Sequence, residues 1–146
     1  MAKIKTKKFY IEELKEYENN PRSNNKAVRA VTESVKDFGY INPIIVNQDG
    51  VILAGHTRLK ALKELDADEV ECIVISHLTE EEEKAFRIAD NRAAEFSEWD
   101  PDLLVSEMKK VDADDWEKYG FKDKELAKLQ PPEICKCPKC GKSFYI

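Results

Sequence analysis

The chain has 146 residues, which is enough for one domain with a buried core and a short tail. Charged residues make up 36% and apolar residues 42%, a balance that suits a soluble globular protein. The formal net charge of −5 argues against a protein that coats nucleic acid through charge alone. No apolar run reaches the length of a membrane span and no signal-peptide pattern follows Met1, so we expect a cytoplasmic protein.

The first forty residues predict a short strand, a loop and one amphipathic helix. Residues 3–11 favour a strand, and residues 11–14 favour a single helical turn. Asn19-Asn20-Pro21-Arg22 must form a loop, because proline disfavours helical backbone at the residue before it. Residues 26–38 place Val28, Val31, Val35 and Phe38 on one helical stripe, which we expect to pack in the core. Gly39 supplies the helix stop.

A hairpin is predicted next, from two apolar runs around a polar turn. The runs are residues 43–46 and 51–54, and residues 47–50 read Asn-Gln-Asp-Gly. We expect Asp49-Gly50 to supply the left-handed positions of a tight turn.

The second run of this hairpin leads through Gly55 directly into a helix. Leu59, Leu62 and Leu65 follow on one helical face. Such a helix N-terminus offers unpaired N–H groups to a phosphate, and glycine lets the anion approach the backbone. The first turn carries His56, Thr57 and Arg58, of which Arg58 has a planar fork that suits phosphate. The alternative is an ordinary strand-to-helix turn with a solvated polar first turn.

The second half of the chain predicts a strand and two capped helices. Residues 70–75 form the strand, in which Cys72 is most simply a small buried residue. Thr79 and Glu82 make a capping box for a helix that runs to Asp90-Asn91-Arg92. Asp100-Pro101 begins another helix. Beyond it we expect the aromatic residues to pack the end of the domain (Trp116, Tyr119 and Phe121).

The last sixteen residues contain three of the four cysteines. Pro131-Pro132 opens a linker, and Cys137-Pro-Lys-Cys140-Gly is a zinc-knuckle pattern, with Cys135 as a third thiol. Zinc takes four ligands, so Cys72, a histidine, a second chain or a water must complete the site. The alternative is a set of reduced thiols.

The ordered set of motifs resembles the ParB/sulfiredoxin family over residues 8–110. Asn19-Asn20-Pro21-Arg22 resembles its first box, and residues 38–46 resemble its strand with the pattern G-x-x-x-P-I-x-V. Asp90-Asn91 stands where the family carries Glu-Asn. The resemblance implies an α+β fold, a small mixed sheet with surrounding helices. We expect this domain in residues 1–130, with residues 100–130 as a helical extension and 131–146 as the tail.

The resemblance also implies a site for a nucleoside triphosphate, CTP or ATP, with Mg²⁺. Asp90 would be the catalytic residue and the magnesium ligand. The phosphate-binding set would be Gly55, His56, Thr57, Arg58, Arg22 and Asn91. Two departures from the family pattern argue against efficient nucleotide hydrolysis. The Asp90 side chain is shorter than the usual Glu, and Ala93-Ala94 stands where the family carries a Gln-Arg pair. His56 stands where the sulfiredoxin reaction needs a cysteine, which disfavours that activity.

The leading hypothesis is therefore a nucleotide-binding domain of a DNA-associated protein of phage or plasmid type, with weak NTPase or nuclease activity. A second hypothesis is a non-catalytic module that recruits a DNA methyltransferase or another DNA enzyme. A third is a small-molecule kinase with Glu16 or Glu18 as general base. A homodimer would be compatible with each, and we expect no membrane partner.

Overall fold

The computed structural model describes residues 4–21, 25–111, 115–122, 134–136 and 143–145. The chain divides into two compact units. The first comprises residues 1–97 and 118–120, and the second comprises residues 98–117 and 121–146. The expected boundary between residues 130 and 131 falls outside the described residues and stays a prediction.

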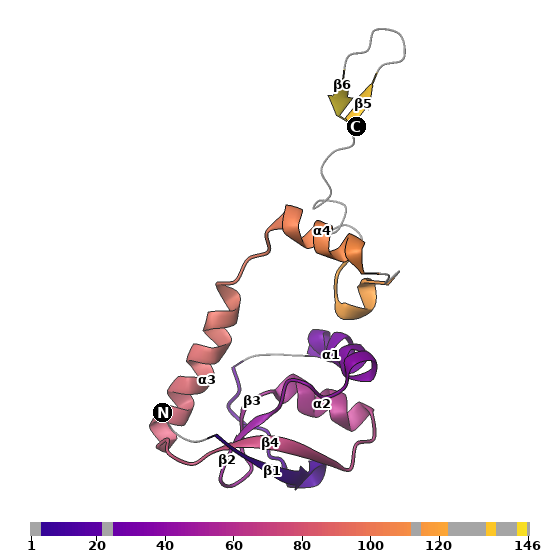
Figure 1. Ribbon diagram of the computed structural model, residues 1–146. Coiled ribbons are helices and arrows are strands. Elements are labelled where there is room, and N and C mark those ends of the chain that lie inside the picture. The colour runs from indigo at the N-terminus through magenta and orange to yellow at the C-terminus, as the bar shows by residue number, and fades with distance from the viewer. Residues whose placement is uncertain (1–3, 22–24, 112–114, 123–133, 137–142, 146) are drawn as a thin grey trace. The chain divides into compact units, whose positions relative to one another are not determined.

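A four-stranded mixed sheet forms the base of the first unit (Figure 1). Its strands are β1 (Lys5–Tyr10), β2 (Ile45–Asn47), β3 (Ile52–Ala54) and β4 (Glu69–Ile75), in the order β1-β4-β2-β3. β4 runs antiparallel to β1 and parallel to β2, whereas β2 and β3 form an antiparallel hairpin. The predicted α+β class with a small mixed sheet is confirmed.

The hairpin turn between β2 and β3 differs in detail from the prediction. Gly50 has a φ of 77°, but Asp49 is not among the described residues with positive φ. Asn47 explains the difference, because its Oδ1 accepts hydrogen bonds from the backbone N–H groups of Asp49 at 3.1 Å and Val51 at 2.9 Å. This side chain shapes the turn locally, so that only one left-handed residue is needed.

Alternation along the central strand β4 gives the sheet one buried face. Val70 and Cys72 are buried, whereas the flanking Glu69 and Glu71 are exposed. The buried side chains join a core with residues of β1, η1 (Ile11–Glu13), the hairpin and α2. The core comprises Phe9, Ile11, Leu14, Ile44, Val46, Ile52, Leu59, Leu62, Val70 and Cys72. Cys72 is fully buried, as predicted.

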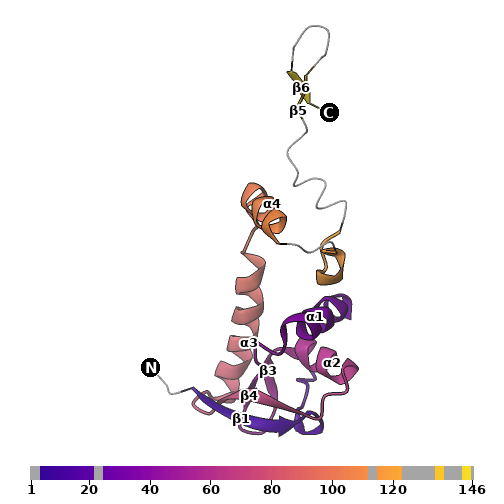
Figure 2. The ribbon, with the colours of Figure 1, turned by 45° about the vertical axis from the view of Figure 1, so that its right-hand side comes forward.

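Helix α2 (His56–Glu64) adds Leu59 and Leu62 to the core on the buried face of the sheet, and α1 (Asn25–Phe38) packs side by side with α2 (Figure 1, Figure 2). The predicted apolar stripe of α1 is only partly correct. Val28 is 7% exposed, but Phe38 is 60% exposed and stacks on Tyr119, with ring centroids 5.6 Å apart. Phe38 is the last residue of α1 and lies beyond the core. It therefore packs on the ring of Tyr119 instead of on core side chains.

A third helix, α3 (Glu80–Glu95), contacts the edge strand β3. It begins at the predicted capping box: the Thr79 hydroxyl accepts a hydrogen bond from the Glu82 N–H, and the Glu82 carboxylate accepts one from the Thr79 N–H at 2.8 Å. Its acidic first turn suits the positive end of the helix dipole.

The second unit contains α4 (Pro101–Lys110), a short helical turn η2 (Glu117–Tyr119) that continues into the first unit, and a two-stranded sheet. Asp100 caps α4, as predicted, by accepting from the Leu103 N–H at 3.0 Å. Phe121 packs edge-to-face on Trp116 and contacts Trp99. The sheet pairs β5 (Ile134–Lys136) with β6 (Ser143–Tyr145). Within the described ranges, no helix combines the length and apolarity needed to cross a membrane.

Candidate functional site

Gly55 forms the turn between β3 and α2, at the position where the sequence predicted a phosphate site. Its φ of 106° lies in the left-handed region that disfavours every side chain. A Cβ atom here would lie 3.2 Å from Ile44 Cγ1 and 3.3 Å from Ile44 Cα. The hairpin therefore holds this backbone against the core, which only glycine permits.

The N-terminus of α2 is open on its outer side. Gly55 is the N-cap residue and provides no side-chain hydrogen bond. The first intrahelical bond runs from the Leu59 N–H to the Gly55 carbonyl at 3.1 Å, so the N–H groups of residues 56–58 precede the helical ladder. These groups and the helix dipole favour an anion at this end.

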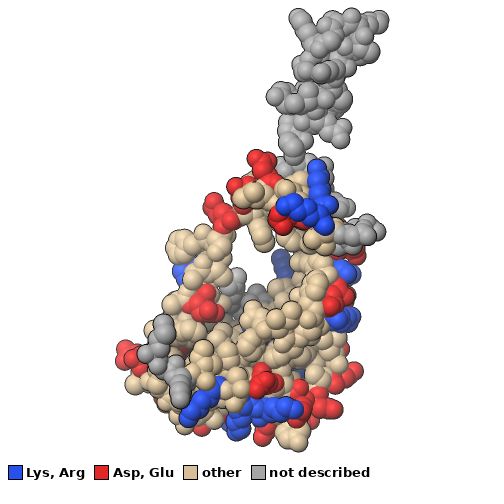
Figure 3. Space-filling view, in the orientation of Figure 1, with Lys and Arg blue, Asp and Glu red and all other residues tan. Residues whose placement is uncertain are grey.

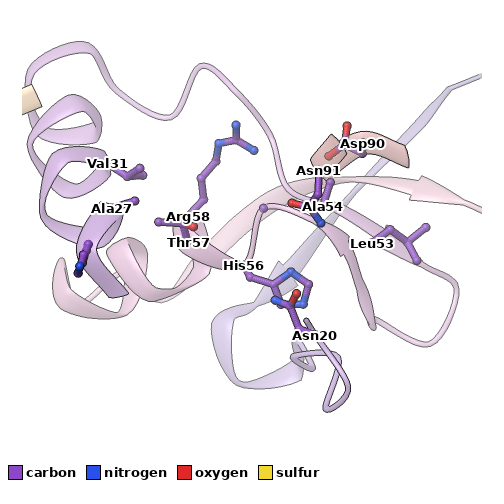
Figure 4. Close-up of a pocket in the computed structure, with 12 residues that line it drawn as sticks. Asn20, Ala27, Val31, Leu53, Ala54, His56, Thr57, Arg58, Asp90 and Asn91 are labelled. Carbon is purple, nitrogen blue, oxygen red and sulfur yellow. The ribbon is translucent and has the colours of Figure 1, made fainter. Parts of the chain in front are cut away.

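A cavity of about 380 Å³ opens beside this helix terminus. Figure 4 shows that its walls come from α1, from the end of β3, from the first turn of α2 and from α3. The lining residues are Asn20, Lys26, Ala27, Val31, Leu53, Ala54, Gly55, His56, Thr57, Arg58, Asp90 and Asn91. The cavity thus brings together six of the seven residues predicted to form the nucleotide site. The seventh, Arg22, lies outside the described residues.

Arg58 is half-buried and reaches back toward the loop before β2. Its Nη1 donates to the Pro43 carbonyl at 3.4 Å, which uses one of the five N–H donors of the guanidinium. Burial lowers the pKa of Arg58, while the charges of Tyr40 and Asp90 act in the opposite direction. Asp90 is therefore close enough to Arg58 to act on its charge, although the two are far apart in sequence.

His56 points inward rather than into solvent. It is 8% exposed, and its Nε2 accepts a hydrogen bond from the Tyr17 N–H at 3.2 Å. Burial is the main cause that lowers the pKa of His56. The ring is consequently neutral near pH 7, with its proton on Nδ1 because Nε2 is the acceptor. The sequence predicted a phosphate contact here, and the structure adds a role in holding residue 17.

Asp90 and Asn91 lie on α3, at the other side of the cavity (Figure 4). Asp90 is exposed, and Asn91 is held by its own helix, since its Nδ2 donates to the Arg87 carbonyl at 2.8 Å. Within the described part of the chain, no group of three His, Cys, Asp or Glu side chains could hold a metal ion. A magnesium ion here would thus rest on Asp90 and on the phosphates of a ligand, the usual arrangement for this ion.

Sequence reasoning missed two residues of this region. Lys26 lines the cavity from the first turn of α1, but as a lone lysine it gave no motif. Arg87 is only 5% exposed, and its Nε donates to the Ile52 carbonyl at 3.1 Å. Glu83 stands four residues before Arg87 and its carboxylate lies 3.4 Å from Arg87 Nη2; that spacing was the one available signal.

The predicted zinc ligands cannot be placed. Cys137 and Cys140 lie outside the described residues, and of Cys135 the structure describes only its position in β5, opposite Phe144. Cys72 is unsuited as a fourth ligand, because it is fully buried in β4 and burial raises the pKa of its thiol to about 11. The three-cysteine site stays a prediction.

Charges over the sheet are mixed rather than of one sign. Figure 3 shows blue and red side chains next to one another along the lower edge of the view. On the sheet, Lys8 of β1 forms an ion pair with Glu69 of β4. Lys5, Lys7 and Lys8 lie in the edge strand β1, and the ion pair with Glu69 weakens Lys8 as an electrostatic contact for DNA.

Comparisons with known proteins agree with this fold. The family model of the ParB N-terminal domain matches residues 2–92. The chain is 39% identical, over 75 residues, to the ParB-like nuclease domain-containing protein YnaK of Escherichia coli (strain K12), and the match covers 51% of this chain and 86% of YnaK. The fold is similar to the crystal structure of the C-terminally truncated chromosome-partitioning protein ParB from Caulobacter crescentus complexed with CTP-gamma-S. That match has a TM-score of 0.62 at 19% identity and covers 86% of this chain and 70% of the other. The chain belongs to the family of ParB N-terminal domains.

Proposed function

We propose that the domain binds a nucleoside triphosphate, with its phosphates at the N-terminus of α2. The observation that carries this proposal is the cavity that joins the open helix terminus to Arg58 and Asp90. The family membership supports it, since the similar structure of the Caulobacter protein contains a CTP analogue.

Each charged group has a distinct part in this binding. The N–H groups of residues 56–58 and the guanidinium of Arg58 would hold phosphate oxygens, because both are donors at one end of the cavity. Asp90 would hold a magnesium ion that bridges the phosphates and neutralises part of their charge. Thr57 and Asn91 would add neutral hydrogen bonds.

The protein would act in association with DNA, as a switch rather than as a fast enzyme. The loss of the Gln-Arg pair, replaced by Ala93-Ala94, removes groups that could stabilise a transition state, whereas the binding end of the cavity is intact. A nuclease or a brisk NTPase is therefore the less supported activity.

The test is isothermal titration of CTP, ATP and GTP, each with magnesium, into the wild type and Arg58→Ala. We expect one nucleotide to bind the wild type and binding to be lost in Arg58→Ala. Arg58→Lys should restore it only in part, because lysine cannot make the bidentate contact.

The matched control is Arg29→Ala, on an exposed position of α1 that does not line the cavity. It removes the same charge and should leave affinity unchanged. Equal affinity of the wild type and Arg58→Ala would overturn the site. Failure of the wild type to bind any nucleotide would favour the recruiting module instead.

A further inference from the structure

Arg87 is a buried cation that the proposed phosphate contacts do not use. Its side chain is nearly inaccessible, at 7%, and the Glu83 carboxylate beside it is 14% exposed. A buried guanidinium is costly unless its donors and its charge are satisfied. The contacts of the Arg87 side chain must therefore compensate for the burial of its charge.

The contacts of Arg87 connect three segments. Its Nε donates to the Ile52 carbonyl on β3 at 3.1 Å, which joins α3 to the hairpin. The plane of its guanidinium lies over the Tyr17 ring, with 4.0 Å from Cζ to the ring centroid. Its own carbonyl accepts the Asn91 amide at 2.8 Å. The guanidinium thus touches the strand before Gly55 and the loop at residue 17, whereas the contact with Asn91 uses the main chain of residue 87 and does not depend on its side chain.

The Glu83 carboxylate extends this connection to the hairpin turn. It accepts from Asn47 Nδ2 at 3.2 Å, in addition to its contact with Arg87. Asn47 also shapes the β2–β3 turn through its Oδ1. The carboxylate therefore balances the buried charge and connects the guanidinium to the hairpin turn.

Tyr17 carries the connection to the first turn of α2. Its ring is held by Arg87, while its backbone N–H donates to His56 Nε2 at 3.2 Å. His56 is the first residue of α2 after Gly55, so a contact that fixes the His56 ring also constrains the helix terminus that would face a phosphate.

We propose that Arg87 is a positioning residue for the phosphate turn, whose side chain holds Tyr17 in place against His56. The effect on nucleotide affinity rests on the proposed function, but the effect on His56 does not. The alternative is a purely structural arginine that fastens α3 to β3 and has no influence on the turn.

The two alternatives differ in the hydrogen bond of His56, because only a positioning arginine is needed to keep Nε2 as the acceptor of the Tyr17 N–H. The pKa of His56 does not separate them by itself, since the charge of Arg87 acts on it in either case. Four influences act on its pKa: burial, Arg87 from α3 and Lys60 from α2 lower it, and Glu16 raises it. The chain has only two histidines, His56 and His77, so the ring resonances can be assigned without ambiguity. His77 is exposed in the loop before α3 and serves as an internal reference.

The experiment compares wild type, Arg87→Gln and Arg87→Lys by NMR titration of the histidine rings and by calorimetry with CTP, ATP and GTP. In Arg87→Gln we expect the pKa of His56 to rise, its Nε2-acceptor signature to weaken, and nucleotide affinity to fall about tenfold. Arg87→Lys keeps the charge and should hold the pKa of His56 nearer the wild type. Circular dichroism checks that each variant is folded.

A second variant covers the case in which Arg87→Gln does not fold. Tyr17→Leu removes the ring under the guanidinium but keeps the backbone N–H, and it should also loosen His56 and weaken affinity. If folded Arg87→Gln or Tyr17→Leu leaves the tautomer and the Nε2 hydrogen bond of His56 unchanged, the positioning role is overturned, even where the pKa has moved with the lost charge. If His56 responds but the wild type binds no nucleotide, the positioning role stands and the proposed function fails.

Discussion

The two sides of the candidate cavity are built differently. On the α2 side, Gly55 is pressed against Ile44 and His56 is 8% exposed, so the backbone is held by the core. On the α3 side, Asp90 is exposed and Asn91 donates to a carbonyl of its own helix. The groups that would bind phosphate are therefore preorganised by packing, whereas the group that would hold magnesium depends on the ligand.

The largest effect on stability and binding should follow from a substitution at Gly55, on the tightly packed α2 side of the cavity. Gly55→Ala forces a side chain into a left-handed residue and against Ile44, and should lower the free energy of unfolding by about 2–3 kcal/mol. Nucleotide binding should be lost with it. Urea unfolding and calorimetry measure the two effects.

Gly39→Ala is the matched control, because Gly39 has a φ of 82° but an added Cβ would meet nothing within 4 Å. Gly39→Ala should lower the free energy of unfolding by only about 1 kcal/mol, the cost of placing a side chain on a left-handed residue. Equal losses in the two variants would show that the contact with Ile44 does not constrain the turn.

The exposed side is tested by Asp90→Asn, which removes the carboxylate but keeps its shape. We expect any nucleotide hydrolysis to disappear, because magnesium stabilises charge that develops in the transition state. Affinity should change less than in Arg58→Ala. A phosphate-release assay measures the hydrolysis rate, and calorimetry measures the nucleotide affinity. Hydrolysis that persists in Asp90→Asn would assign the metal to another residue.

A smaller effect should appear in the pH dependence of stability. Burial lowers the pKa of His56 in the folded state, so the unfolded chain binds the proton more readily. His56 then contributes stability that is complete above its unfolded pKa of about 6.5 and is lost as the pH falls below it. Urea unfolding between pH 7 and 5 measures this loss.

His56→Gln provides the comparison, since it cannot titrate in this range but keeps a hydrogen-bonding side chain. The slope of stability against pH should be shallower in this variant than in the wild type. An identical slope would mean that other groups carry the acid sensitivity.

The smallest effect on the first unit should come from the cysteines of the tail. We expect about one zinc per chain, or one per two chains if the site is shared, in protein purified without chelator. Cys137→Ser with Cys140→Ser should remove it and leave the unfolding of the first unit unchanged. Metal analysis decides the first point, and zinc that persists in the double variant would contradict the knuckle assignment.

Features that the sequence determined by itself depend on residues close together in the chain. The Thr79–Glu82 capping box and the Asp100 cap each involve a few consecutive residues. Their hydrogen bonds and backbone angles are fixed by local chemistry, so residue types and spacing are sufficient to predict them. The resemblance to the family, which rests on the order of several motifs, supplied the prediction of which residues lie around the cavity.

The burial of charged and polar side chains was decided only by the tertiary structure. Arg87 meets the Ile52 carbonyl 35 positions away, and Tyr17 meets His56 across 39. A polar side chain is buried only where a distant segment supplies its partner, and local spacing contains no record of that partner. The same reason explains why only the four-residue spacing from Glu83 pointed to Arg87, which is the centre of a buried network in the fold.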